Sequence, residues 1–148
     1  VYIKYASGID KCIAILQAPR MLTDDPTTFV LWGNSGVGKS RLARECCRDL
    51  GLSYYSKDPG GPWWDGYSGQ PAIVLDDFEG RFPYRDLLRV LDRYEYTAWV
   101  KGSGRQLVAN TFFITSNMHP QTWYPNEDYA PLKRRLTWIF HCTKFNMY

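Results

Sequence analysis

The chain carries one glycine-rich segment whose residue types and spacing suit phosphate binding. It follows the pattern G-x-x-x-x-G-K-S and consists of Gly33, Asn34, Ser35, Gly36, Val37, Gly38, Lys39 and Ser40. Glycines allow the backbone to turn tightly, so that successive N–H groups can face a phosphate group. In such a loop the lysine reaches the outer phosphates of a nucleotide, and the serine hydroxyl is a ligand of Mg²⁺. The segment therefore predicts a binding site for ATP and Mg²⁺.

Three polar residues further along the chain suit the hydrolysis of a bound nucleotide. Asp76 and Asp77 directly follow an apolar run at 72–75, and Asn117 follows a second run at 112–115. Hydrolysis requires a further contact to the metal ion and a group that orients the attacking water. We expect the two aspartates to contribute to the Mg²⁺ site, with Asp77 polarising the water. We expect Asn117 to contact the γ-phosphate and the same water.

A basic cluster at 133–135 offers the positive charge that the transition state of hydrolysis needs. Arg134 or Arg135 could supply this charge. If the two arginines face a neighbouring subunit, one of them acts as an arginine finger in that subunit's site. The alternative interpretation is a solvated basic patch with no catalytic role.

A glycine-rich segment at 101–105 lies between two β-favouring runs, at 97–100 and 106–109. This arrangement predicts a hairpin with an exposed tip. A cation on such a tip can contact the backbone phosphates of DNA without reading its sequence. An exposed hairpin with no partner is the alternative. The candidate DNA-binding residues are Lys101, Gly102 and Arg105.

Short apolar runs alternate with amphipathic segments along the chain, and this pattern indicates how the candidate residues are positioned. The amphipathic periodicity predicts helices over 9–22, 41–50 and 83–94, and Gly51 is expected to end the second of these. Buried strands that alternate with helices predict a three-layer α/β fold with a mostly parallel sheet, as in P-loop NTPases. The expected buried strands are 28–32, 53–55, 72–75, 112–115 and 136–140.

The length, charge and cysteine spacing of the sequence indicate what class of protein it belongs to. The 148 residues suffice for one domain, which we expect at 27–148 after a helical leader at 1–26. A formal charge of +3 is compatible with an anionic partner. The sequence has no apolar stretch of the roughly 18 residues that a membrane span needs, and it has no signal-peptide pattern, so we expect no membrane contact and no secretion. The four cysteines lack zinc-ligand spacing and are expected to be reduced thiols of a cytosolic or nuclear protein.

An aromatic segment at 63–67 has two interpretations. Its tryptophans and its tyrosine could stack on a base or on the adenine ring. They could instead pack a loop over the sheet, and this is the interpretation that we favour.

Taken in order, these segments resemble the helicase domain of the replication initiator (Rep) of circular single-stranded DNA viruses. The circovirus-like branch of that family is most similar. Its members are superfamily 3 helicases within the AAA+ class. The resemblance rests on 33–40 as Walker A, 74–78 as Walker B and 114–117 as motif C, supported by 63–67, 92–94 and 101–102.

The resemblance implies a hexameric ring that hydrolyses ATP between its subunits and pulls single-stranded DNA through its centre. It implies that Lys101 grips the DNA, and it favours Arg135 over Arg134 as the arginine finger because Arg135 precedes Leu136 and Thr137. A viral initiator of this kind acts in the host nucleus. The nuclease domain that precedes the helicase domain in this family is absent from the sequence, so we expect a fragment of a longer protein.

Two alternative functions stay open at this point. A nucleotide-gated assembly module that binds DNA without unwinding it would use the same residues. A small-molecule kinase also combines a Walker A loop with an α/β core, but the acidic and amide residues at the strand ends favour an enzyme that activates water.

Overall fold

The computed structural model describes residues 2–3 and 25–143. The predicted helix over 9–22 and nearly all of the predicted leader lie outside the described residues. The boundary between the leader and the ATPase domain therefore stays a prediction.

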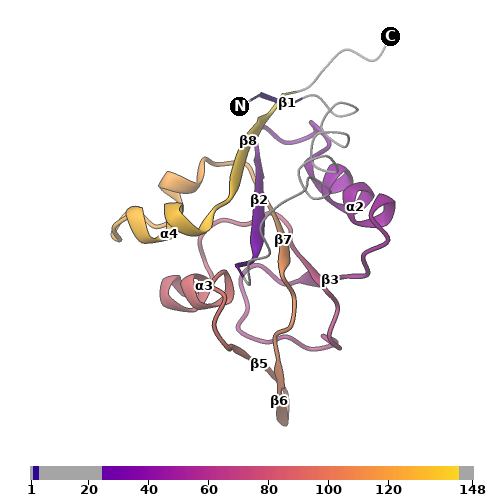
Figure 1. Ribbon diagram of the computed structural model, residues 1–148. Coiled ribbons are helices and arrows are strands. Elements are labelled where there is room, and N and C mark those ends of the chain that lie inside the picture. The colour runs from indigo at the N-terminus through magenta and orange to yellow at the C-terminus, as the bar shows by residue number, and fades with distance from the viewer. Residues whose placement is uncertain (1, 4–24, 144–148) are drawn as a thin grey trace.

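A parallel six-stranded sheet forms the centre of the molecule (Figure 1). Its strand order is β1-β8-β2-β7-β4-β3, and every neighbouring pair is parallel. The middle strands are apolar along most of their length because both of their faces are covered, which explains why short apolar runs predicted them. The strands are β1 (Tyr2–Ile3), β2 (Thr27–Trp32), β3 (Tyr54–Lys57), β4 (Ala72–Leu75), β7 (Thr111–Ser116) and β8 (Trp138–Cys142).

Helices cover the two faces of the sheet, which confirms the three-layer α/β fold. Helix α2 (Lys39–Asp49) lies on one face, and α3 (Tyr84–Val90) and α4 (Ala130–Arg135) lie on the other (Figure 1). A separate core of buried side chains lies on each face of the sheet, between the sheet and the helices. A short 3₁₀ helix, η1 (Pro120–Thr122), follows β7.

The end of α2 agrees with the predicted stop at Gly51. Gly51 has a φ of 69°, a left-handed conformation that suits glycine. Its N–H donates to the Arg48 carbonyl (3.0 Å), and the Leu52 N–H donates to the Cys47 carbonyl (2.9 Å). These two bonds form a Schellman motif, which satisfies the last carbonyls of the helix.

Two elements near the basic cluster differ from the prediction. Helix α3 ends at Val90 instead of Tyr94, and beyond it the Arg93 N–H donates to the Asp92 carboxylate, a local contact that competes with helical hydrogen bonds. Helix α4 was not predicted, since six residues are too few to show a helical period. The last strand consequently begins at Trp138 and not at 136.

The predicted hairpin is present, but its second strand and its tip were wrong. Strands β5 (Thr97–Val100) and β6 (Ser103–Gln106) pair antiparallel, with Val100 opposite Ser103. The turn therefore contains only Lys101 and Gly102, and Gly102 has a φ of 92°. Arg105 lies within β6, opposite Ala98, and not in the tip.

The hairpin and the glycine-rich loop lie at opposite ends of the sheet. The hairpin projects from the end where β7 begins, at the bottom of Figure 1, and the loop follows the carboxyl end of β2, at the top. Among the described residues, no helix is long and apolar enough to cross a membrane.

Candidate nucleotide site and nucleic-acid interface

The glycine-rich loop is held between the carboxyl ends of β7 and β8. The Gly33 N–H donates to the Ser116 carbonyl (3.0 Å). A Cβ atom at Gly33 would lie 2.3 Å from the Cys142 carbonyl oxygen, so only glycine fits there. Gly38, with a φ of 92°, is the N-cap of α2 and provides no side-chain cap. The first N–H groups of α2 are therefore available to an anion.

Lys39 brings the loop together with Asn117. Its Nζ donates to the carbonyls of Gly33 and Asn34, both at 2.8 Å, and to Asn117 Oδ1 at 3.1 Å. The side chain is folded back onto the loop and is only 7% exposed. Burial lowers the pKa of Lys39, although nearby acidic groups oppose this effect. Two of the predicted site residues, 78 positions apart, are thus in direct contact.

Asp76 is the point at which three elements meet. Its Oδ1 accepts hydrogen bonds from Ser40 Oγ (2.5 Å) and from Thr115 Oγ1 (2.6 Å), and its Oδ2 lies 3.4 Å from Arg44 Nη2. Burial acts to raise the pKa of Asp76, but these hydrogen bonds and the charge of Arg44 outweigh it and hold the pKa below its usual value. Two of the three predicted Mg²⁺-site residues, Ser40 and Asp76, therefore present oxygen atoms to the same point.

Asp77 lies beside this point in an uncommon backbone conformation. Its φ is 54°, and among the described residues it alone combines a positive φ with a side chain other than glycine. Its N–H donates to Thr115 Oγ1 (3.0 Å), so one hydroxyl supports both aspartates. The Asp77 side chain is exposed and borders a cavity of about 240 Å³ with the loop 58–60. A carboxylate in this position can reach a water molecule.

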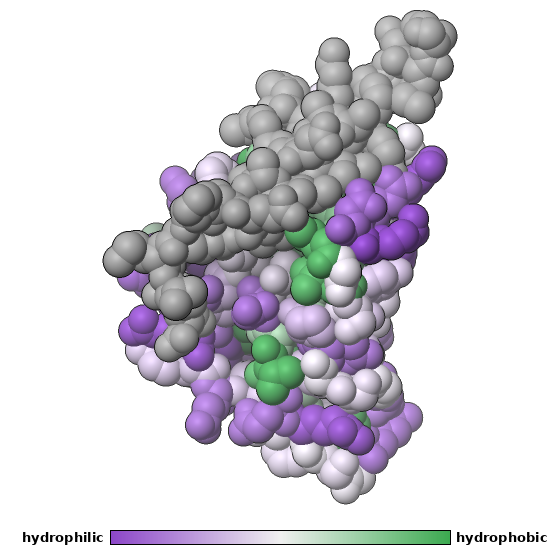
Figure 2. Space-filling model, turned by 45° about the vertical axis from the view of Figure 1, so that its right-hand side comes forward, coloured by the Kyte–Doolittle hydropathy of each residue, from purple (hydrophilic) through white to green (hydrophobic). Residues whose placement is uncertain are grey.

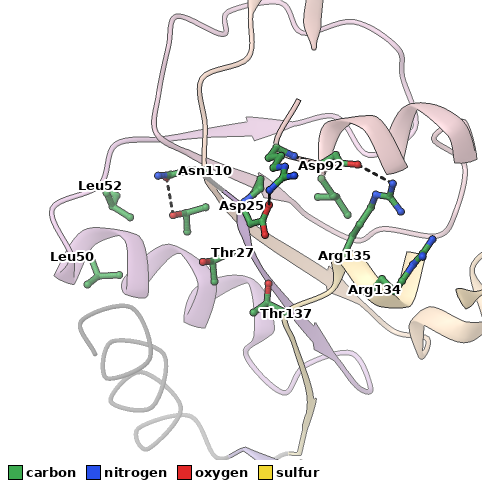
Figure 3. Close-up of a pocket in the computed structure, with 13 residues that line it drawn as sticks. Asp25, Thr27, Leu50, Leu52, Asp92, Asn110, Arg134, Arg135 and Thr137 are labelled. Carbon is green, nitrogen blue, oxygen red and sulfur yellow. Dashed lines mark hydrogen bonds and ion pairs between the residues drawn. The ribbon is translucent and has the colours of Figure 1, made fainter. Parts of the chain in front are cut away.

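Arg134 and Arg135 lie at the other end of the sheet. They border a cavity of about 930 Å³ that also involves Thr27 and Thr111, the first residues of β2 and β7 (Figure 3). Arg135 donates from Nη2 to Asp92 Oδ2 (2.9 Å) and from Nη1 to a carbonyl within α4 (2.7 Å), whereas Arg134 is exposed. The structure therefore does not bring either arginine to the glycine-rich loop of its own chain.

The aromatic segment at 63–67 anchors the hairpin. Trp64 and Tyr67 are each only 1% exposed, which agrees with the packing interpretation, but Trp63 is 47% exposed. Lys101 and Arg105 are both exposed on the anchored hairpin. Two hydrogen bonds join the segment to the hairpin, from Trp64 N–H to the Trp99 carbonyl (2.8 Å) and from Lys101 N–H to Asp65 Oδ1 (3.0 Å). A third, from Val108 N–H to the Tyr67 hydroxyl (3.1 Å), joins it to the residues that follow β6.

Comparison with known proteins agrees with this geometry. A protein-family model described as RNA helicase matches residues 29–118, which include the loop, both aspartates, the hairpin and Asn117. The chain belongs to this helicase family. It is a superfamily 3 helicase domain, and hence an ATPase of the P-loop class. Arg134 and Arg135 lie after the matched range.

Viral replication proteins are similar over nearly the whole chain. The replication-associated protein of Canary circovirus is 41% identical over 144 residues, covering 95% of this chain and 47% of that protein. The replication-associated protein of Beak and feather disease virus is 38% identical over 148 residues, covering 97% of this chain and 49% of that protein. The helicase domain described above corresponds to the helicase region of these proteins. The chain spans about half the length of the curated relatives that it matches.

The fold of the helicase domain also resembles a solved AAA+ structure. The S. cerevisiae Hsp104:casein complex in its extended conformation matches with a TM-score of 0.59 and 17% sequence identity, covering 92% of this chain and 32% of that chain. At this identity the likeness concerns the fold alone.

The structure adds a buried lysine that sequence reasoning missed. Lys57, the last residue of β3, is 1% exposed, and its Nζ donates to the carbonyls of Asp58 (2.6 Å) and Gly61 (2.5 Å). The ammonium group also lies 5.3 Å from the Trp64 ring and 5.1 Å from the Phe82 ring. Burial lowers the pKa of Lys57 to about 8. These hydrogen bonds of Lys57 fix the loop at 58–60, which borders the cavity beside Asp77.

Thr115 and Arg44, the two other contacts of Asp76, were also missed. Thr115 is fully buried within an apolar strand, and this polar residue among apolar ones was the available signal. Arg44 lies at a position in the helical pattern that is typical of exposed residues, so the sequence does not indicate its contact with Asp76.

Proposed function

We propose that this helicase domain hydrolyses ATP to move along single-stranded DNA, as part of the replication initiator of a circular single-stranded DNA virus. One observation carries the proposal. Lys39 of the loop, Asp76 and Asp77 after β4, and Asn117 after β7 converge at the carboxyl edge of the sheet. This combination suits a water-activating ATPase.

In the proposed site, Lys39 exchanges its contacts when nucleotide binds. Its three donors now bond two loop carbonyls and Asn117. Phosphate oxygens are stronger acceptors for an ammonium group than neutral carbonyls. We expect Lys39 to turn to the outer phosphates and to release Asn117, whose amide then contacts the γ-phosphate.

The chemistry of the donor set fits Mg²⁺. A serine hydroxyl and a carboxylate are hard oxygen ligands, and Ser40 Oγ and Asp76 Oδ1 are already 2.5 Å apart. Mg²⁺, when bound, neutralises charge on the phosphates. The depressed pKa of Asp76 keeps its carboxylate ionised and ready to act as a ligand at neutral pH.

Asp77 is the proposed residue that polarises the attacking water. Its carboxylate is exposed at the site edge, while its backbone N–H is fixed by Thr115. Asp77 is exposed and has a left-handed backbone, whereas Asp76 is hydrogen-bonded to Ser40 and Thr115, and this difference supports separate roles for the two neighbours.

An arginine finger at Arg134 or Arg135 would have to act between chains. Arg134 and Arg135 lie at the end of the sheet opposite the glycine-rich loop, so they can approach only the loop of another copy. This supports ATP hydrolysis at the interfaces of a hexameric ring. Arg135 is our candidate because of its sequence setting, and Arg134, which is more exposed, is the alternative.

The hairpin is the proposed DNA contact. It projects beyond the sheet in Figure 1, and Lys101 occupies its two-residue turn. A cation in this position can bind a backbone phosphate of any sequence. For the full protein we propose a nuclear location in the host cell, in keeping with the replication-associated relatives.

Steady-state ATP hydrolysis across protein concentrations, with and without single-stranded DNA, tests the proposal. Turnover per subunit should rise steeply with concentration and further with DNA. Lys39→Ala, which we expect to be inactive, is the negative control. Concentration-independent turnover would contradict a site shared between chains. DNA-stimulated turnover without strand displacement would indicate a nucleotide-gated switch instead of a motor. Because the matched family is described as RNA helicase, single-stranded RNA of equal length belongs in the same series.

A further inference from the structure

Trp99 is the large aromatic residue of the hairpin, and it is not part of the core. Its side chain is 58% exposed, whereas the preceding residue, Ala98, is fully buried. On the described part of the face in Figure 2, hydrophobic residues form only small, separate patches. The exposed indole of Trp99 is therefore available for contact with a ligand.

The indole ring lies over the opposite strand. Trp99 pairs with Gly104 across the hairpin. A Cβ atom built on Gly104 would lie 3.0 Å from Cζ3 and 3.1 Å from Cε3 of the ring. The ring therefore occupies the space that a side chain at residue 104 would need. This contact supports one part of the ring, and more than half of the side chain stays accessible.

The backbone on both sides of the ring is fixed. The Trp99 carbonyl accepts from the Trp64 N–H (2.8 Å), and the Lys101 N–H donates to Asp65 Oδ1 (3.0 Å). The backbone at both Trp99 and Lys101 is thus fixed by the segment at 63–67. Little backbone freedom would be lost when both side chains contact one ligand.

Charge and aromatic surface occur together on this hairpin. Lys101 is exposed in the turn, and all four residues of β6, including Arg105, are exposed. Cations that follow a phosphate backbone, combined with an aromatic face for a base, are the features that bind unpaired nucleic acid. A purely apolar protein partner would not need the cations.

We propose that Trp99 stacks on an unpaired base of the strand whose phosphate Lys101 contacts. The proposal rests on the DNA-binding function proposed above for the hairpin. It divides the binding into a phosphate contact, which weakens with salt, and a stacking contact, which needs a base and tolerates any base.

Fluorescence anisotropy with two labelled oligonucleotides of equal length tests the proposal. One is oligothymidine and the other carries abasic sites throughout, so that both have the same phosphates. Trp99→Leu should weaken binding of oligothymidine roughly five- to a hundredfold and leave binding of the abasic strand unchanged. Trp99→Tyr should retain most of the affinity, because tyrosine keeps an aromatic face. Lys101→Ala should weaken binding of both strands.

Trp138→Leu is the matched control. Trp138 is also exposed, at 41%, but it lies on β8 and not on the hairpin, and its replacement should leave both affinities unchanged. Thermal unfolding and sedimentation of each variant report on folding and assembly. If Trp99→Leu binds oligothymidine normally while Lys101→Ala is impaired, stacking is refuted and the hairpin keeps its DNA role. If neither variant matters, both proposals fail. If Trp99→Leu weakens both strands in parallel with a loss of assembly, Trp99 contacts another copy of the chain and stacking is refuted.

Discussion

Ser40 and Asp76 share a hydrogen bond of 2.5 Å, although Ser40 lies in the first turn of α2 and Asp76 follows β4, 36 positions later. Thr115 completes this arrangement from a third element, since its hydroxyl donates to Asp76 and accepts from the Asp77 N–H. The proposed metal ligand and the proposed water-activating residue therefore depend on one hydroxyl group.

Thr115→Val should slow ATP hydrolysis about tenfold or more, because Asp76 loses a hydrogen bond and Asp77 loses its backbone anchor. Asp76 has a lowered pKa in the folded protein, so its carboxylate is lost as pH falls through that value. Removing the Thr115 hydroxyl raises this pKa, and the acid limb of the activity profile should move to higher pH. A pH series of steady-state rates measures both effects. Thr115→Ser keeps the hydroxyl and should restore the rate and the profile; an unshifted acid limb in the valine variant would contradict the role of Thr115.

Asp77→Asn should bind ATP normally but hydrolyse it roughly a hundredfold more slowly, because an amide is a poor acceptor for a proton from water. Asparagine is the appropriate replacement because it tolerates the left-handed φ of 54° better than alanine does. Binding of a fluorescent nucleotide and release of phosphate are the two measurements. Rapid hydrolysis by this variant would remove Asp77 from the proposed role.

Arg135→Ala should leave nucleotide binding intact and suppress hydrolysis by neighbouring subunits. Mixing it with Asp77→Asn chains should restore some activity, because a mixed interface can pair an intact Arg135 with an intact Asp77. The substitution also breaks the ion pair with Asp92, so Asp92→Asn is the control for that loss. Normal hydrolysis by Arg135→Ala, with a defect in Arg134→Ala, would assign the finger to Arg134.

Lys57→Met should change the pH dependence of stability. Burial lowers the pKa of Lys57 to about 8, below its usual value of 10.5, so the folded state disfavours the charged form. Between these two values the unfolded chain binds more protons than the folded chain, and the wild type gains stability as pH rises. The methionine variant lacks this gain. Urea unfolding of both proteins at pH 7 and pH 10 should therefore show the wild type gaining free energy of unfolding relative to the variant at pH 10. A constant difference would show that folding does not lower the pKa of Lys57.

The sheet and the nucleotide loop could be predicted because their sequence signals are local. Strand β4 is a four-residue apolar run that ends at two aspartates, and the run coincides with the observed strand. Strand β6 offers no such signal: its four residues are Ser, Gly, Arg and Gln, all exposed, so the predicted pairing was displaced toward the apolar run at 106–109. Turn geometry at Gly102, and not hydrophobic pattern, sets the register there.

The residues that support the site were harder to predict because their contacts come from distant parts of the chain. A lysine at the end of a strand, such as Lys57, has the same local pattern as an exposed cation. Its burial depends on Trp64 and Phe82, which come from two later loops. The two-sided contact of Thr115 likewise requires the parallel pairing of β4 with β7.

The length of the sheet separates the glycine-rich loop from Arg134 and Arg135, and this separation has a genetic consequence under the proposed mechanism. A chain that has lost its arginine still joins a ring and still binds nucleotide, but it disables the site of its neighbour. An intact chain cannot compensate, because its own arginine serves the site of its neighbour on the other side. In a cell that holds two versions of the gene, the defective allele would therefore be partly dominant over the functional one, because each mutant copy disables a site in an intact neighbour.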